Sequence, residues 1–546
     1  MRGVTRPSDP LDMVLTYHRE TRHHYHRFAS SLGYMDWATQ PDPFRRYAGS
    51  DKLLLPRHRA RQGVAYDRLF DGCDVAVAPL DLDALAEFLR HGLAVSAWKR
   101  FQESRWALRI NPSSGNLHPT EGYLLLPPGP WGRAGLFHYL PEDHSLERRA
   151  AVAPELWARV FPGLPAGAFL VGLSSILWRE AWKYGERGFR YCQHDVGHAL
   201  AALRLAASLN GWRLAIAPEW SHRALATLLG LDRADGFLAE EREEPELLAL
   251  VWPGPAGRAL PSEATAEDLG AWRASAWTGT ANRLSKDHHD WSIITYVADA
   301  TLKPAGIAGE PVALVPRAVP DLASQPDGRD VVRQRRSAVD LDGRSATSVD
   351  HLLRMLRQVL PAQGAPWDAL HWEPQIHLLL FVHRVEGLAP GVYCLPRSAV
   401  GEARLRATAR PGFLWQKPDG VPADLPLWFL WPGDCRHVAK SVSCSQDIAG
   451  DGFFSVGMLA HFTPALHARG PWFYRNLFWE TGVIGQVLYL EAEALGARGT
   501  GIGCFFDEPV LQVLGLSGEE FQSLYHFTVG VPVEDARLTT EPAYPE

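Results

Sequence analysis

Two long stretches of the chain carry apolar residues at helical spacing, at i, i+3, i+4 and i+7, and both end at a glycine. One runs from Arg190 to Gly211 and the other from Arg475 to Gly496. This spacing predicts a buried helix in each case, and the glycine marks its C-terminal end. Upstream of the first helix, the segment TEGYLLLP after Pro119 predicts a strand, and the segment QIHLLLFV before the second helix resembles it.

The two helices belong to an internal repeat. Arg190 and Arg475 lie 285 residues apart (475 − 190), and this offset holds over about 40 residues without a gap. Further upstream, GLFHYL from Gly135 resembles GVYCL from Gly391 at an offset of 256 (391 − 135). The second copy therefore carries about 29 extra residues (285 − 256). Other pairs at the offset of 285 are Asp195 with Glu480, Gly197 with Gly482 and Leu203 with Leu488.

The repeat predicts an α+β fold that is built from two diverged copies of one unit. We expect the first unit, with an N-terminal arm, over residues 1–260 and a connector over 261–325. The second unit is expected over 326–546, with its insertion at about 400–470. The arm sequence DPLDMVLTYHRETRHHYHRF is amphipathic enough for one helix, and we expect it to wrap the other half.

Composition excludes several classes of protein. The net charge of −7 over 546 residues argues against nucleic-acid binding, and no apolar run is long enough to span a membrane. Six cysteines without a CxxC pair, and an N-terminus without an apolar signal core, indicate a reducing cytoplasm. The histidines near the N-terminus lack a recognisable zinc spacing, so we expect no metal. No Walker loop, GxSxG, or GxGxxG after a strand is present, which argues against a P-loop NTPase, an α/β-hydrolase and a Rossmann dehydrogenase.

The strongest local signal in the first copy is the segment Asn111–Pro119, which precedes the predicted strand. Its proline, small hydroxyl residues and glycine predict a tight turn whose backbone can approach a flat ligand, and Asn116 offers donors and an acceptor to a heterocycle. A plain surface turn is the alternative. The candidate cofactor-binding residues here are Pro112, Ser113, Ser114, Gly115 and Asn116.

Lys183 and Tyr184 precede the first repeated helix. Both can carry protons if desolvation or a neighbouring cation depresses their pKa values. At the offset of 285 the second copy has Ala468 and Arg469, so the pair is absent there. The alternative is an exposed loop before a helix.

The second copy offers different residues. Arg335, Arg336 and Ser337 combine guanidinium groups with a hydroxyl, which suits a phosphate monoester, although a solvated basic turn is the alternative. The run Gly501, Ile502 and Gly503 permits close backbone approach to a ligand, although it also suits a plain helix-to-strand turn.

These segments together resemble the nitroreductase superfamily of FMN enzymes, and most closely its SagB-type dehydrogenase branch, which includes azoline oxidases. RRS at Arg335–Ser337 resembles the opening phosphate-binding motif, PSSGNLHPTEGY the flavin-contacting loop, and WKYGERGFRY the stretch with the Lys-Tyr pair. GQVLYLEAEALGARGTGIG resembles the interface helix and the loop at the flavin ring. VGVPVEDARL resembles the usual end of the family, which makes Arg537 a further candidate phosphate ligand.

The resemblance implies FMN as the cofactor, bound at an interface between two units. The losses of the two copies are complementary, so we expect an intramolecular pseudo-dimer with one complete and one decayed FMN site. The implied activity is hydride transfer between a substrate and flavin N5, with Lys183 or Tyr184 moving the proton, in the dehydrogenation of a small molecule or an azoline-type modified peptide. An NAD(P)H-dependent reductase and a non-catalytic scaffold or partner subunit are the alternatives. Further oligomerisation stays open.

Overall fold

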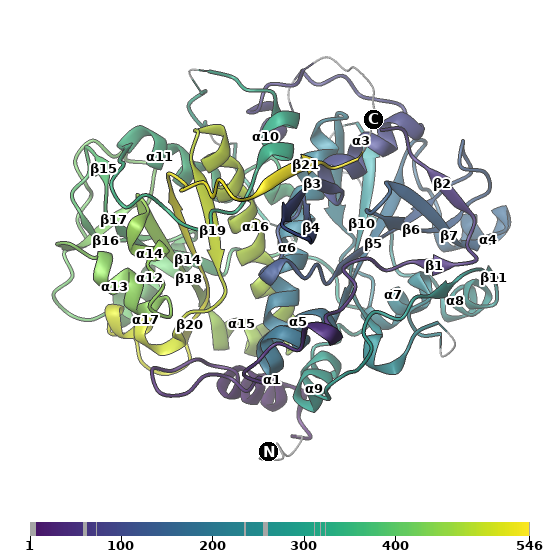
Figure 1. The fold of residues 1–546 in the computed structure, drawn as a ribbon, viewed down its shortest axis with the longest axis horizontal. Helices are drawn as coiled ribbons and strands as arrows, with labels where there is room; N and C mark the ends of the chain where they lie inside the picture. Colours follow the sequence, from purple (N-terminus) through teal and green to yellow (C-terminus); the bar gives the residue numbers. More distant parts are fainter. Residues whose placement is uncertain are drawn as a thin grey trace.

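Two large β-sheets flank a central pair of long helices (Figure 1). The structure, a computed structural model, describes residues 7–57, 63–72, 74–233, 236–254, 260–310, 312–316, 318–322 and 324–544. This arrangement confirms the predicted α+β class.

The sheet of the first half has eight strands. Residues 120–126 form its central strand. Every residue of this strand is buried, because helices cover the sheet on both sides. The main path, in spatial order, is β11 (Ala276–Trp277), β7 (Ser145–Ala151), β6 (Gly135–Leu140), β5 (Thr120–Leu126), β8 (Phe169–Ile176), β10 (Glu243–Pro253) and β9 (Trp212–Ile216), and β2 (Lys52–Leu54) pairs with β7.

The sheet of the second half repeats this order. Its six strands are β17 (Trp428–Pro432), β16 (Gly391–Leu395), β14 (Ile376–Val382), β18 (Phe454–His461), β20 (Phe521–Gly530) and β19 (Arg498–Ile502). The predicted internal repeat is thus present as two matching sheets, with β14 in the place of β5 and β18 in the place of β8.

The extra chain of the second half lies between β16 and β18. This stretch contains α12 (Ala399–Thr408), β17, α13 (Arg436–Val442) and α14 (Ile448–Asp451), where the first half has β7 and α4 (Pro154–Val160) between β6 and β8. By contrast, β18 and α15 (Phe462–Arg469) correspond to β8 and α5 (Leu177–Tyr184) at the offset of 285. The domain boundaries themselves stay a prediction.

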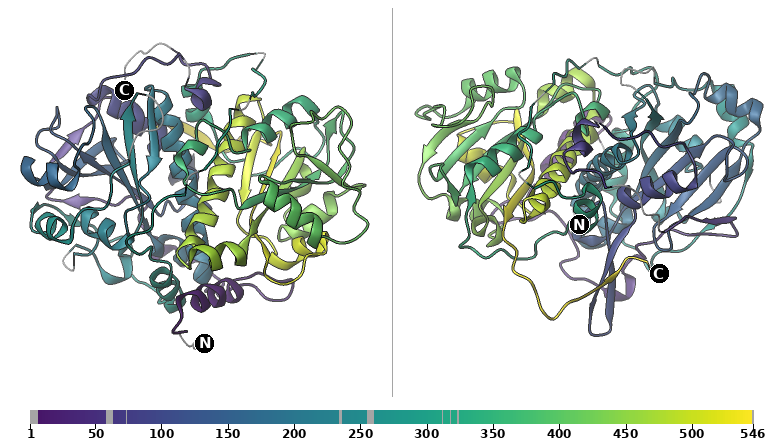
Figure 2. Two further views of the ribbon diagram at one scale, coloured as in Figure 1. Left: turned by 180° about the vertical axis from the view of Figure 1, so that it is seen from behind. Right: turned by 90° about the horizontal axis from the view of Figure 1, so that it is seen from above.

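The central helices are α6 (Gly188–Ser208) and α16 (Phe473–Ala494), side by side in both views of Figure 2. Gly197 lies against the backbone of Trp479, and Gly482 lies against the backbone of His194. At the offset of 285, Gly197 is equivalent to Gly482 and His194 to Trp479, so the two contacts are equivalent by exchange of the two halves. Such reciprocity is the mark of a two-fold interface, here within one chain.

Both ends of the chain cross to the opposite half. The arm forms α1 (Pro10–Glu20), whose His18 bonds Tyr474 and Gln522 of the second half at 3.2 and 3.3 Å. At the other end, β21 (Thr539–Pro542) pairs with β3 (Val95–Phe101) of the first half, which in turn pairs with β4 (Ser104–Arg109) (Figure 1). The halves are therefore joined by exchange of their termini as well as by the helix pair.

The remaining helices cover the sheets and build the connector. The connector region contains α8 (Ala266–Arg273) and α9 (Ser292–Ala300). Helices around the first sheet are α2 (Arg68–Asp71), α3 (Leu82–Gly92), α4 (Pro154–Val160) and α7 (His222–Leu229), and those of the second half include α10 (Gly328–Gln334), α11 (Val349–Gln358) and α17 (Asp507–Leu514). The short strand pairs are β1 (Tyr47–Ala48) with β12 (Thr280–Ala281) and β13 (Thr347–Ser348) with β15 (Val385–Glu386).

Candidate functional site

A cavity of about 320 Å³ lies where the two halves meet beneath the β3–β4 hairpin and the crossing C-terminal segment. The first half contributes Pro112, Ser113 and Asn116, and the second contributes Arg335, Arg336 and Ser337. Six of the candidate cofactor-binding residues, separated by more than 200 positions in the sequence, therefore line one space.

The wall of this cavity is rich in cations. Besides Arg335 and Arg336 it includes Lys99, Arg109 and Arg498. Its two acidic residues are already engaged, since Glu534 pairs with Arg498 and Asp535 pairs with Arg537 at 2.8 Å outside the cavity. The cavity therefore has an excess of positive charge, which suits an anionic group.

Arg335 and Arg109 hold unsatisfied donors in this wall. They are 3% and 2% exposed, and the Nε of each is buried without a hydrogen-bond partner. Burial lowers the pKa of Arg335, and it lowers the pKa values of Arg109 and Arg336 to about 10. Buried donors and charges without partners are costly, so an anion that accepts from them would be stabilising there.

The loop before β5 has the tight geometry that its sequence predicts. Gly115 and Asn116 have φ angles of 58° and 60°, the left-handed region. The loop is held from α6, because Asp195 accepts hydrogen bonds from the Ser114 amide at 3.1 Å and its hydroxyl at 3.2 Å. The Asn116 side-chain NH2 donates to the Ala107 carbonyl at 2.9 Å, which leaves its oxygen as the group that can face a ligand.

Lys183 and Tyr184 lie directly beside this loop. A Cβ placed on Gly115 would be 2.6 Å from the Tyr184 hydroxyl and 3.1 Å from the Lys183 amine. Burial raises the pKa of Tyr184 well above its ordinary value, so its hydroxyl stays protonated. Proton abstraction by this pair requires a depressed pKa. Tyr184 shows the opposite shift and fits a hydrogen-bond donor, not a base.

The Gly501–Gly503 segment lies in and after β19, and its residues do not line the cavity. Tyr489 joins it to the arginine motif, because its hydroxyl accepts from the Gly501 amide and bonds the Ser337 hydroxyl, each at 2.9 Å. At the other end, Tyr191 donates to the Gly503 carbonyl at 3.2 Å and packs on Tyr184, with 4.4 Å between ring centroids. The run Gly501, Ile502 and Gly503 thus bridges the arginine motif and the Lys-Tyr pair.

Arg537 is placed differently from the other candidates. Its side chain is 75% exposed, it pairs with Asp535, and it does not line the cavity. Arg109 and Arg498, which do line it, were missed because each is a single cation in or beside a strand, without a local motif.

Two buried carboxyl groups near the site were also missed. Asp195 is 1% exposed, and burial raises its pKa to about 7. Glu180, one turn before Lys183 in α5, is wholly buried with neither carboxyl oxygen bonded, and burial raises its pKa well above the usual range. The sequence did carry a signal for Asp195, because an acid recurs at the same position of the second copy, at Glu480. Like Asp195, Glu480 accepts hydrogen bonds from backbone amides at or before the start of a central strand, those of Gln375 and Ile376 at 3.0 and 3.2 Å.

The counterpart of the cationic cavity lacks its group of cations. The Arg335–Ser337 motif has its nearest counterpart at Tyr66–Gly72, and there a cavity of about 220 Å³ is lined by Asp67, Asp71 and Asp321. Asp67 pairs with Arg354 and Asp71 with Arg68, and the arginine in the lining, Arg357, pairs with Asp424 at 2.7 Å. Because the arginine in its lining is already paired, this place does not suit a phosphate.

Neither a metal centre nor a membrane helix is found in the part of the chain that the structure describes. There, no three His, Cys, Asp or Glu residues cluster in a way that could hold a metal ion. Likewise, none of the described helices combines the length and the apolar composition needed to cross a bilayer.

The fold can be identified by its likeness to a solved structure. No family model and no curated protein matches the chain. Among solved structures, a protein described as a nitroreductase from Anabaena variabilis superposes with a TM-score of 0.69 at 20% identity, over 95% of this chain and 99% of that chain. The chain therefore has the nitroreductase fold, which confirms the prediction of two such units fused as a pseudo-dimer.

Smaller likenesses cover less than half of the chain. A protein described as a nitroreductase from Ralstonia eutropha has a TM-score of 0.28 at 15% identity, over 42% of this chain and 97% of that chain. The Escherichia coli microcin synthetase McbBCD complex with truncated pro-MccB17 has a TM-score of 0.26 at 17% identity, over 45% of this chain and 93% of that chain.

Proposed function

We propose that this chain is an FMN-dependent oxidoreductase with one flavin site, formed between its halves. The observation that carries the proposal is the cavity in which buried, unsatisfied guanidinium groups meet the Ser113–Asn116 loop. When bound, FMN supplies hydride transfer at its N5. The fit is chemical: Arg335, Arg336 and the Ser337 hydroxyl offer donors to a phosphate, as do Arg109 and Arg498.

The Lys183–Tyr184 pair would handle the proton that accompanies the hydride. The Tyr184 hydroxyl, protonated in its buried setting, orients a substrate as a donor, and the Lys183 amine accepts or returns the proton. This division of roles favours dehydrogenation of a small molecule or an azoline-type peptide. Reduction driven by NAD(P)H is the alternative direction.

The test is an absorption spectrum of the purified protein, followed by denaturation and quantification of released flavin. We expect a flavin band and about one FMN per chain, because the arginine that lines the counterpart cavity is already paired with Asp424. Two FMN per chain would contradict the single site, and none after addition of FMN would favour a non-catalytic scaffold.

Arg335→Ala supplies the matching variant. Loss of a buried charge-assisted contact should weaken FMN binding by about tenfold or more, measured by fluorescence titration. Arg333→Ala is the control, because Arg333 lies two positions away, is 43% exposed and pairs only with Asp330 among the described residues. Equal affinity in both variants would contradict the assignment of the phosphate end.

A further inference from the structure

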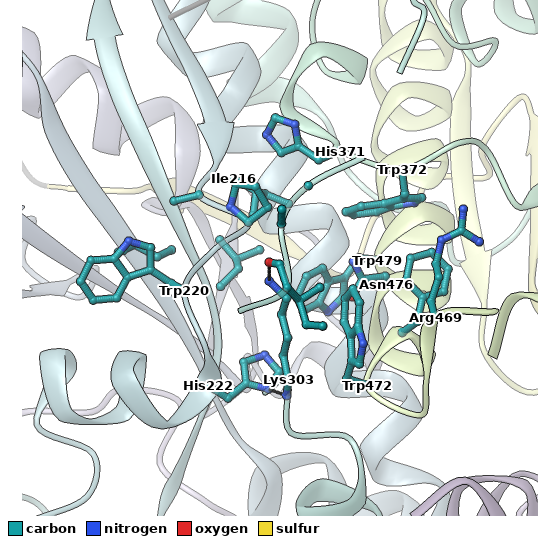
Figure 3. Close-up of a pocket in the computed structure, with 18 of the residues that line it drawn as sticks. Ile216, Trp220, His222, Lys303, His371, Trp372, Arg469, Trp472, Asn476 and Trp479 are labelled. Carbon is teal, nitrogen blue, oxygen red and sulfur yellow. Dashed lines mark hydrogen bonds between the residues drawn. The ribbon is translucent and has the colours of Figure 1, made fainter. Parts of the chain in front are cut away.

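A second cavity between the halves lies at the counterparts of the Gly501–Gly503 run and of the Lys-Tyr pair. At the offset of 285, Ile216–Pro218 correspond to Gly501–Gly503, and Ala468–Arg469 correspond to Lys183–Tyr184. Both segments line this cavity, which has a volume of about 250 Å³. Figure 3 shows that its wall comes from both halves. A small ligand pocket has about this size.

Indole rings form much of the wall. Trp372, Trp472 and Trp479 lie on the side of the second half (Figure 3). The Trp479 indole donates to Gln193 at 2.8 Å and that of Trp372 to Glu480 at 3.3 Å, which fixes both rings. The indole N–H of Trp472 is buried without a partner. Fixed aromatic walls favour a flat apolar body.

Two polar side chains in this wall are nine-tenths buried and have bonding capacity to spare. Lys303 is 9% exposed, and its amine donates to the Ile307 carbonyl at 3.0 Å and lies 5.4 Å from the Trp472 ring centre. Within the described residues it forms no ion pair. Asn476 is 6% exposed, and its amide has no hydrogen-bond partner among the described residues.

The other charged groups of the wall are already neutralised. Arg469 forms a two-pronged ion pair with Glu310, and Glu246 pairs with Arg475 at 2.8 Å. Both ring nitrogens of His222 are bonded, to the Glu246 carbonyl and the Lys303 amide. Burial lowers the pKa of Lys303 to about 8, so at pH 7 its ammonium form predominates and lacks a counter-ion in direct contact.

We infer that this cavity binds a small, flat aromatic carboxylate, with its ring among Trp372, Trp472 and Trp479 and its carboxylate on Lys303 and Asn476. The ligand is not FMN, because the counterpart of the Arg335–Ser337 motif is lined by three aspartates and by an arginine that is already paired with Asp424. The inference goes beyond the proposed flavin chemistry and does not depend on it.

The test is isothermal titration calorimetry of the full-length protein with 2-naphthoate, and with 2-naphthamide as the neutral analogue. We expect one 2-naphthoate per chain, weaker binding of the amide, and unchanged flavin content. In Lys303→Met the affinity for 2-naphthoate should fall about tenfold or more, through loss of a charge-assisted contact, while that for 2-naphthamide stays the same. Lys52→Met, at an exposed lysine paired with Asp143, should change neither.

Three results would overturn the inference: no binding of 2-naphthoate, equal affinity in wild type and Lys303→Met, or release of bound flavin by 2-naphthoate, which would place it in the first cavity. If Lys303→Met does not fold, Asn476→Leu and Ala217→Leu replace it. The first removes the amide and the second narrows the cavity, and both should weaken binding. The Arg335→Ala protein must still bind 2-naphthoate, and this separates failure of the flavin proposal from failure of this one.

Discussion

Asp195 shows how one buried side chain can shape the candidate site. Its carboxyl holds the Ser114 backbone and hydroxyl from the interior of α6, while the neighbouring Glu180 makes no hydrogen bond within the described residues. Burial raises the pKa values of both groups. We propose that these two carboxyl groups act as a proton store close to the place where hydride chemistry would occur.

Stability should report the ionisation of Asp195. Its pKa is about 7 in the folded state, against about 3.9 in an unfolded chain. Between these values the folded state binds the extra proton, so the free energy of unfolding falls as the pH rises from about 4 to about 7. Asp195→Asn keeps an acceptor for Ser114 and cannot ionise. We expect a flatter pH dependence and a gain of up to about 4 kcal/mol at pH 7, measured by urea unfolding.

The exposed Asp419 gives the control for this measurement. Asp419→Asn should follow the wild type at every pH. If Asp195→Asn also follows the wild type between pH 4 and 7, Asp195 is ionised throughout that range and is not a proton store.

The two residues of the Lys-Tyr pair should differ in how much each contributes to turnover. With a substrate that turns over, Lys183→Met should lower kcat by about 10²–10⁴-fold, because the group that accepts or returns the proton is lost. Tyr184→Phe should lower kcat less, because it removes only a hydrogen-bond donor that stays protonated. Both variants should retain flavin. Lys286→Met, at an exposed lysine, is the control, and wild-type turnover in Lys183→Met would remove Lys183 from the mechanism.

Among the individual site residues, those that belong to a motif could be predicted from the sequence, and isolated ones could not. The Pro112–Asn116 and Arg335–Ser337 segments lie together, as the complementary losses of the two copies predicted. Arg109 and Arg498 were not predicted, because they belong to no motif and only the fold brings such isolated cations to one cavity. The roles of all these residues stay predictions.

At the scale of elements, α6 and α16 set the geometry of the molecule. Every residue of α6 is buried, although a helix on the surface of a single unit would show one polar face. The sequence predicted both helices and the glycines after them, Gly211 and Gly496, which have φ angles of 65° and 72°. It did not predict their crossing point, since that depends on which glycines meet.

The crossing can be tested at its two glycines. A Cβ at Gly197 would lie 2.2 Å from the Trp479 carbonyl oxygen, and one at Gly482 would lie 2.2 Å from that of His194. Because backbone must move, Gly197→Ala and Gly482→Ala should each destabilise the fold by about 1–3 kcal/mol or more in urea unfolding. The reciprocity of the contacts predicts similar losses for the two variants.

Gly270 is the matched control, since it is a helical glycine in α8 with open space around its Cβ position. Gly270→Ala should be neutral or stabilising by about 0.5–1 kcal/mol, because alanine is the better helix former. A loss for Gly197→Ala no larger than that for Gly270→Ala would show that the helices are not in close contact.

At the scale of the whole molecule, fusion makes one composite site out of two incomplete units. The offset of 285 revealed the two units, because a repeat survives divergence in spacing as well as in residue type. The exchange of termini was only partly foreseen: the arm was expected to wrap the other half, whereas the pairing of β21 with β3 was not. A short strand at a chain end leaves too weak a pattern to reveal its partner.

This architecture predicts how the chain behaves when it is divided between Ser324 and Gln325, two exposed residues at the end of the connector. Expressed alone, each part would expose one face of α6 or α16, together with the binding surface of the missing terminus, and should aggregate. Expressed together, the parts should co-purify through a tag on either one and bind about one FMN per pair, because each cavity wall comes from both halves. Soluble separate halves that each bind FMN would contradict the composite site, and a co-purifying pair without FMN would support the pseudo-dimer while contradicting the flavin proposal.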